Sequence, residues 1–173
     1  MLLLLLTILS VAAAPDATAS TPTRTCEQRI EAGGAPLAFP SPRSGRVLAG
    51  PLAFSGLFPR TPARLGPRRE NGRFSLKAGA LVRAGRPVVL SVPGRYRGRL
   101  FLNYARSSTG EPVVRFQPCE PSTRAFSYDG PVGPVTGFSG GFEVTSPGCY
   151  PLLVDVVGGR SYRVRVSLGR PCR

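Results

Sequence analysis

Glycine and proline are the residues that most restrict how this chain can fold. The chain has 173 residues, of which 21 are glycine and 19 are proline. Inside a helix, a glycine costs about 1 kcal/mol and a proline about 3 kcal/mol relative to alanine, so this composition excludes a helical bundle. Hydrophobic residues still make up 42% of the chain, which is enough for one core. The composition therefore favours short strands joined by many turns.

The alternation of apolar runs and turn residues predicts where these strands lie. We expect strands at 46–57, 73–84, 87–92, 99–105, 112–117, 142–145, 150–157 and 161–168. The first should be bulged at Gly50-Pro51, because proline cannot donate to a ladder hydrogen bond. Gly158-Gly159 predicts a hairpin turn between the last two strands. About eight short strands at roughly ten-residue spacing predict an all-β, immunoglobulin-like β-sandwich.

The N-terminal residues predict export. Residues 2–14 form an apolar run that is shorter than the roughly 20 residues needed to span a bilayer as a helix. Such a run is typical of a signal peptide. We expect cleavage after Ala19, because cleavage after Ala14 would leave Pro15 as the first mature residue. No other segment is apolar enough to cross a membrane. The expected organisation is a signal peptide at 1–19, an extended leader at 20–42 and a β-sandwich domain at 43–173.

Four cysteines, Cys26, Cys119, Cys149 and Cys172, predict two disulfides in an exported chain. No two of them are spaced as Cys-x-x-Cys, which argues against a thioredoxin-type site and a zinc ribbon. Three pairings are possible. We favour Cys119–Cys149 with Cys26–Cys172, because the second bridge would tie the mature N-terminal region to the chain end. In terms of loop-closure entropy, so long a loop stabilises the fold by about 4–5 kcal/mol.

The absence of histidine restricts the possible chemistry. Histidine is the usual general base and a common metal ligand, and the chain has none. Ser-His-Asp and Cys-His catalysis within this chain are therefore excluded. A Ser-Lys pair would depend on Lys77, the one lysine, and the few carboxylates lie mostly at strand ends or in loops. We therefore predict a non-enzymatic protein with no catalytic residue, no metal and no cofactor.

Positive charge is concentrated in the first half of the mature chain. Residues 43–106 contain 13 arginines and Lys77 against Glu70 alone, whereas residues 107–173 contain 7 arginines against 5 acids. One interpretation is attraction to an anionic envelope polymer such as wall phosphates, acidic polysaccharide or anionic lipid. The alternative is a solvated basic face in which codon bias selects arginine over lysine. The candidate anion-binding residues are Arg60, Arg64, Arg68, Arg69 and Arg73.

The aromatic residues divide into two groups. Those inside expected strands should be core residues, namely Phe74, Phe101, Tyr104, Phe116, Phe142 and Tyr162. Phe126, Tyr128 and Phe138, with Asp129, lie in a Gly/Pro-rich stretch at 121–140 that we expect to be a loop. These residues either form a binding loop or fold back on the core.

Several sequence motifs carry a resemblance. They are GPLAFSGL at 50–57, PVVLSVP at 87–93, VVRFQPC at 113–119, FSGGF at 138–142, PGCYPLLVDV at 147–156 and VSLGRPC at 166–172. In these motifs the chain resembles a group of small secreted actinobacterial proteins of unknown function. The resemblance implies export and an all-β, disulfide-containing domain, and it transfers no catalytic residue.

These observations together predict a secreted or wall-associated, non-enzymatic β-sandwich module that acts by surface recognition or as a structural component. The alternative is a dedicated arginine-rich binder of anionic envelope polymers. Because an exported chain does not meet nucleic acid as a regular partner, we expect no specific nucleic-acid binding.

Overall fold

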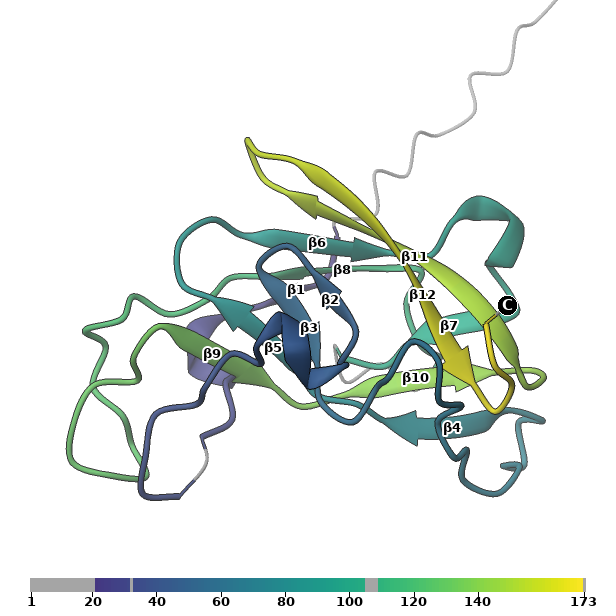
Figure 1. The fold of residues 1–173 in the computed structure, drawn as a ribbon, viewed down its shortest axis with the longest axis horizontal. Helices are drawn as coiled ribbons and strands as arrows, with labels where there is room; N and C mark the ends of the chain where they lie inside the picture. The colour runs from purple at the N-terminus through teal and green to yellow at the C-terminus, as the bar shows by residue number, and fades with distance from the viewer. Residues whose placement is uncertain (1–20, 32, 105–108, 173) are drawn as a thin grey trace, which may run out of the picture.

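The computed structural model describes residues 21–31, 33–104 and 109–172, and in these ranges the fold is all-β (Figure 1). The expected signal peptide at 1–19 lies outside the described residues. Three short 3-10 turns are η1 (Cys26–Gln28), η2 (Pro42–Ser44) and η3 (Gly94–Tyr96). The strands are β1 (Thr23–Arg24), β2 (Leu48–Ala49), β3 (Leu52–Phe54), β4 (Phe74–Lys77), β5 (Ala80–Arg83), β6 (Val88–Ser91), β7 (Leu100–Leu102), β8 (Val113–Phe116), β9 (Val135–Phe138), β10 (Gly141–Val144), β11 (Gly148–Val156) and β12 (Ser161–Leu168).

The strands form three sheets. One has the order β1-β8-β6-β11-β12, the second β4-β10-β7 and the third β2-β3-β5-β9. The chain passes from β4 to β5 and from β9 to β10 with only two residues between the strands of each pair. At this crossing the Ala78 amide donates to the Gly140 carbonyl at 2.9 Å. The two smaller sheets are therefore joined by two neighbouring chain segments.

The larger of two hydrophobic clusters in the described residues lies between the sheets. Phe116 of β8 contacts Phe138 of β9 and Tyr104, with ring centroids 5.2 Å apart in both pairs. Phe142 of β10 contacts Phe54 of β3 at 5.4 Å. The Tyr104 hydroxyl donates to the Ala78 carbonyl at 2.6 Å, and its burial raises the pKa of the phenol well above the usual range. These rings connect all three sheets through one buried cluster.

Most of the expected strands are confirmed. The segments at 87–92, 99–105, 112–117, 142–145, 150–157 and 161–168 correspond to β6, β7, β8, β10, β11 and β12, although residue 105 is outside the described ranges. The hairpin turn at Gly158-Gly159 is confirmed, because β11 and β12 pair antiparallel on either side of it. Short apolar runs between turn residues were enough to locate these strands, with period-two alternation as an additional signal for β12.

Two expected strands and one expected loop are wrong in detail. The segment 46–57 is a hairpin of β2 and β3 rather than one bulged strand, and Gly50 at its turn has a φ of +59°. The segment 73–84 is broken at Ala78-Gly79, where the chain changes sheets between β4 and β5. The stretch 121–140 is not all loop, because it contains the buried strand β9. The described residues thus contain twelve strands rather than about eight.

The expected core aromatics are partly confirmed. Tyr104, Phe116 and Phe142 are fully buried, and Phe138, expected in a loop, is also a core residue. Phe74 and Tyr162 are half-buried against the core. Phe101 is half-buried and lies beneath the Arg73 guanidinium, 3.5 Å from its ring centroid.

The favoured disulfide pairing is wrong. The bridges are Cys26–Cys119 and Cys149–Cys172, with Cα atoms 4.8 and 4.9 Å apart. β1 pairs in parallel with β8, with Arg24 opposite Phe116, so Cys26 and Cys119 leave the two strands side by side. Cys149 lies opposite Ser167 in the β11–β12 ladder, and the Cys172 amide donates to the Ser167 Oγ at 3.0 Å, which returns the chain end to Cys149.

The segment at 20–42 is more closely joined to the sheets than an extended leader. β1 adds an edge strand to the five-stranded sheet, and the Ile30 amide donates to the Gly137 carbonyl at 2.8 Å. The side chain of Arg24 is buried and donates to the carbonyls of Tyr104 and Gln28. The described part of this segment therefore joins the five-stranded sheet at β1.

The core contacts predict the effect of removing a ring. Phe116→Ala should lower the free energy of unfolding by about 3–5 kcal/mol, because it removes a buried ring and leaves a cavity. Phe58, which is 38% exposed, provides a control of the same residue type, and Phe58→Ala should cost clearly less. Urea denaturation of both variants measures the difference, and equal losses would contradict a single core centred on Phe116.

The disulfides should differ in their contribution to stability. Cys26–Cys119 closes a loop with a sequence separation of 93 and Cys149–Cys172 one of 23. Loop-closure entropy then gives about 4–5 kcal/mol for the first bridge and about 3–4 kcal/mol for the second. We expect the Cys26→Ser/Cys119→Ser variant to unfold at lower denaturant than the Cys149→Ser/Cys172→Ser variant. Mass mapping of unreduced peptides tests the pairing itself, and a Cys119–Cys149 peptide would overturn it.

Candidate functional site

The arginine-rich loop between β3 and β4 is attached to two strands along its length. The Ala63 amide donates to the Ser167 carbonyl at 2.8 Å, next to the end of β12. The Gly66 amide donates to the Ser75 carbonyl of β4 at 2.9 Å. These bonds hold the backbone of the loop against the sheets, so that its side chains leave from fixed positions.

The five candidate arginines do not have equivalent surroundings. Arg60, Arg64, Arg68 and Arg69 are exposed, whereas Arg73 is half-buried. The Arg73 guanidinium lies over Phe101 and donates to the Thr109 carbonyl at 2.6 Å. This stacking and hydrogen bonding fix Arg73 within the fold, and we assign it a structural role.

Two of the candidate arginines form ion pairs with the same buried carboxylate. Glu143 of β10 has a side chain only 3% exposed, and its two oxygens lie 3.1 Å from Arg69 Nη1 and 3.4 Å from Arg73 Nη1. Among the described residues, no acidic side chain forms an ion pair with Arg60, Arg64 or Arg68. Arg60, Arg64 and Arg68 of this loop therefore have no carboxylate partner among the described residues.

A groove of about 610 Å³ lies between this loop and the ends of β4 and β10. In the part of the chain that the structure describes, its cationic side chains are Arg64, Arg69 and Lys77, and no carboxylate lines it. Its neutral polar residues are Ser75, Asn103 and Ser139. Sequence reasoning identified Arg64 and Arg69 but missed Lys77 and the three neutral residues, because only the fold brings the ends of β4, β7 and β9 together.

The other candidates lie outside this groove. Arg60 lines a separate depression of about 380 Å³, together with Arg46 and Arg165. Arg68 does not line the groove, and its Nε donates to the Gly72 carbonyl of the same loop at 3.0 Å. The five arginines therefore form a basic face with one groove in it, and they do not form one compact site.

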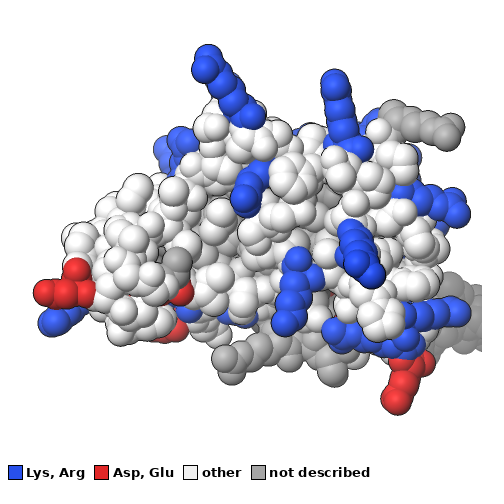
Figure 2. All heavy atoms as spheres, turned by 60° about the horizontal axis from the view of Figure 1, so that its bottom comes forward, with Lys and Arg blue, Asp and Glu red and all other residues white. Residues whose placement is uncertain are grey.

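Four acidic residues lie at the end of the molecule away from β4. Glu27, Glu31, Glu120 and Asp129 belong to the two segments that the Cys26–Cys119 disulfide joins. In Figure 1 these segments lie near β9, at the end away from β4. Figure 2 shows basic side chains over most of one face, with acidic side chains toward both of its ends. The loop between β3 and β4 itself carries one exposed acid, Glu70, so it has a clear excess of basic charge.

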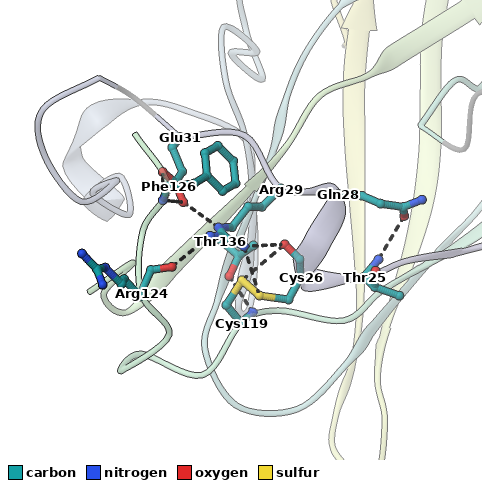
Figure 3. Close-up of a disulfide and its surroundings, with 9 residues drawn as sticks. All are labelled: Thr25, Cys26, Gln28, Arg29, Glu31, Cys119, Arg124, Phe126 and Thr136. Atoms are coloured by element: carbon teal, nitrogen blue, oxygen red, sulfur yellow. Dashed lines mark hydrogen bonds and ion pairs between the residues drawn. A yellow bond between two sulfur atoms is a disulfide. The ribbon is translucent and has the colours of Figure 1, made fainter. Parts of the chain in front are cut away.

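Near the Cys26–Cys119 disulfide, a loop held by hydrogen bonds exposes an aromatic side chain (Figure 3). Phe126 is 65% exposed. Its amide and that of Ser127 donate to the Glu31 carboxylate at 3.0 and 2.8 Å. Arg29 Nε donates to Glu31 at 2.7 Å, and the Arg29 guanidinium lies 4.3 Å from the Phe126 ring centroid. These contacts join the loop around Phe126 to the residues that follow β1.

These hydrogen bonds change the pKa of Glu31. Burial alone would raise the pKa, but hydrogen bonds from Ser127, Arg29 and Phe126 outweigh burial and hold the pKa below its ordinary value. Glu31 is therefore an ionised structural carboxylate at neutral pH.

The described ranges hold neither a metal-binding cluster nor a membrane-spanning helix. No group of three or more His, Cys, Asp and Glu side chains there could hold a metal ion. None of the helical segments in the same ranges is long and apolar enough to cross a bilayer. The chain matches no family model, no curated protein and no solved structure.

The pKa of Glu31 gives a pH-dependent prediction. Because the folded-state pKa is lowered, the ionised carboxylate stabilises the fold above its unfolded pKa of about 4.3. This stabilisation is lost as the pH falls through the lower folded-state pKa. Glu31→Gln should therefore be less stable than the wild type at pH 7, and the difference should shrink as the pH falls below about 4.

Thermal melts of the two proteins between pH 7 and pH 3 measure this effect. Glu120→Gln is a matched control, because Glu120 is exposed at the same end of the molecule. A stability difference for Glu31→Gln that persists unchanged at pH 3 would contradict the role assigned to the carboxylate.

Proposed function

We propose that this protein is a secreted or wall-associated, non-enzymatic module that binds anionic envelope polymers through its arginine-rich face. The observation that supports this proposal is the loop between β3 and β4. It carries Arg60, Arg64 and Arg68 exposed and without ion-pair partners among the described residues. Arginine suits this role because its planar guanidinium can donate two parallel hydrogen bonds to a phosphate or carboxylate.

The placement of the acidic residues favours this function over a generic basic surface. Codon bias explains why arginine replaces lysine, but it does not explain why the basic loop carries only one acid, Glu70, while Glu27, Glu120 and Asp129 lie away from it. A surface of one predominant charge sign raises the local concentration of ligands of the opposite sign. The excess of arginine over acid in this loop therefore supports an anion-binding face.

The proposal includes export and a finer description of the fold. Two disulfides fit an oxidising compartment outside the cytoplasm, and a signal peptide at 1–19 would deliver the chain there. We propose that the joined smaller sheets form one layer of an immunoglobulin-like sandwich and the five-stranded sheet the other, since buried residues of both face one core. The resemblance to small secreted actinobacterial proteins belongs to the same proposal.

Salt-dependent binding tests the function. The exported protein should be retained on a column of immobilised polyanion at low ionic strength and released as salt screens the contacts. Arg60→Gln/Arg64→Gln/Arg68→Gln should weaken binding about tenfold, because three exposed ion pairs at about 0.2–1 kcal/mol each are lost. Arg69 and Arg73 are left intact, since removing them would strand the buried Glu143 carboxylate.

A charge-matched control separates this face from net charge. Arg97, Arg160 and Arg163 are exposed and lie outside the loop between β3 and β4. Arg97→Gln/Arg160→Gln/Arg163→Gln removes the same charge and should weaken binding clearly less. Equal losses in the two triple variants, or no retention at low salt, would overturn the proposal.

A further inference from the structure

We propose that the groove lined by Arg64, Arg69 and Lys77 is the specific binding site for a segment of an anionic glycopolymer. The ligand is a polyhydroxylated chain that carries carboxylate or phosphate groups. This inference rests on the proposed function and adds the position of the site and the chemistry of the ligand.

The groove places three cations around one space. Arg64 and Arg69 come from the loop between β3 and β4, and Lys77 is the last residue of β4. Among the described residues, no carboxylate lines the groove, so an oxyanion that enters it meets no charge of its own sign from these residues. Because arginine and lysine are charged at neutral pH, the site needs no change in protonation to bind its ligand.

Glu143 fixes one of these cations without neutralising the groove. It binds Arg69 through Nη1 alone, at 3.1 Å, and the Arg69 side chain remains 54% exposed. A guanidinium has five N–H donors, so donors other than those on Nη1 remain for a ligand. The buried carboxylate thus positions Arg69 at the rim of the groove, and Glu143 is a positioning residue.

Neutral polar groups complete the lining. Asn103 is held by two backbone hydrogen bonds with Gly141, at 3.0 and 3.1 Å, so its side chain leaves from a fixed position. Ser75 lies in β4, and Ser139 follows β9. Amide and hydroxyl groups donate and accept hydrogen bonds, which matches the hydroxyl groups of a sugar or polyol. Cations alone would suit any anion, whereas this combination suits an anion on a hydroxylated chain.

The groove lacks the feature that single-stranded nucleic acid requires. Proteins that bind such strands stack the bases on exposed aromatic rings. The aromatic residue that lines this groove is Phe142, whose side chain is buried in the core at 1% exposure. Bases would therefore find no stacking surface, and we expect the site to prefer a glycopolymer to an oligonucleotide of equal charge.

The size of the groove fits a short segment of such a chain. Its volume of about 610 Å³ lies within the range of about 300–1,000 Å³ that is usual for small-ligand sites. A short oligomer should therefore bind with one copy per protein. By contrast, attraction to a diffuse basic face needs a long polymer that makes many weak contacts.

Titration calorimetry with short oligomers tests this site in the full, exported chain. The probes are a uronic-acid hexamer, a polyol-phosphate hexamer and a single-stranded oligonucleotide of equal charge. We expect one site per chain for at least one of the two hydroxylated hexamers, and the hexamer that binds identifies the source of the anionic group. Lys77→Gln/Asn103→Ala should weaken that binding about tenfold, the loss expected from one ion pair and one hydrogen bond.

Arg60→Gln/Arg68→Gln is the matched control, because these arginines lie outside the groove. It should leave hexamer binding nearly unchanged while it weakens retention on the long polymer. Thermal melts of both double variants, expected to match the wild type, show that the groove variant is folded.

The outcomes separate this inference from the proposed function. If the long polymer is retained but neither hexamer binds, or if both double variants weaken hexamer binding equally, the groove is not the site and the proposed function stands. Equal binding of the oligonucleotide would overturn the ligand class. If neither the hexamers nor the long polymer bind at low salt, both proposals fail.

Discussion

The close approach of Gly141 to β4 determines how the smaller sheets join and where the groove lies. A Cβ at Gly141 would overlap with the Leu76 carbonyl oxygen, so only glycine fits here without a backbone shift. Gly141 also exchanges both backbone hydrogen bonds with Asn103, while Gly140 accepts one from Ala78. The same few residues thus connect β4, β7 and β10, close the core over Tyr104 and form part of the groove lining.

The sequence pattern located strands where an apolar run lies between clear turn residues, as in β11 and β12 on either side of Gly158-Gly159. It failed where the chain changes sheets, because the apolar pattern of 73–84 continues through Ala78 and Gly79 although the hydrogen-bond partners change from β10 to β9. It also failed at β9, whose four residues are all buried and are surrounded by glycine and proline. Strands of two residues, such as β1, carry no period, so the register that brings Cys26 to Cys119 could not be predicted.

The candidate site was predictable only in part. The arginines of the loop between β3 and β4 were evident from charge alone. The different role of Arg69 and Arg73 was not evident, because their partner Glu143 lies in β10, 74 and 70 residues further along the chain. Lys77, Asn103 and Ser139 each come from a different strand end, and only the three-dimensional pairing of β10 with β4 and β7 places them together.

Under the proposed function, the field at the groove depends on nearby side chains more than on net charge, because salt screens charges over about 8 Å at physiological ionic strength. Near the groove, Glu143 is buried and already shared by two arginines, whereas Arg64 and Lys77 are exposed. The loop between β3 and β4 carries one exposed acid, Glu70, against its arginines. The other exposed acids of the described residues lie in the segments joined by Cys26–Cys119, near β9 and away from β4, where Glu31 orders the loop that carries Phe126. Because these segments lie at the end away from β4 and salt screens their charge, their acids can stabilise a loop without opposing an anion at the groove.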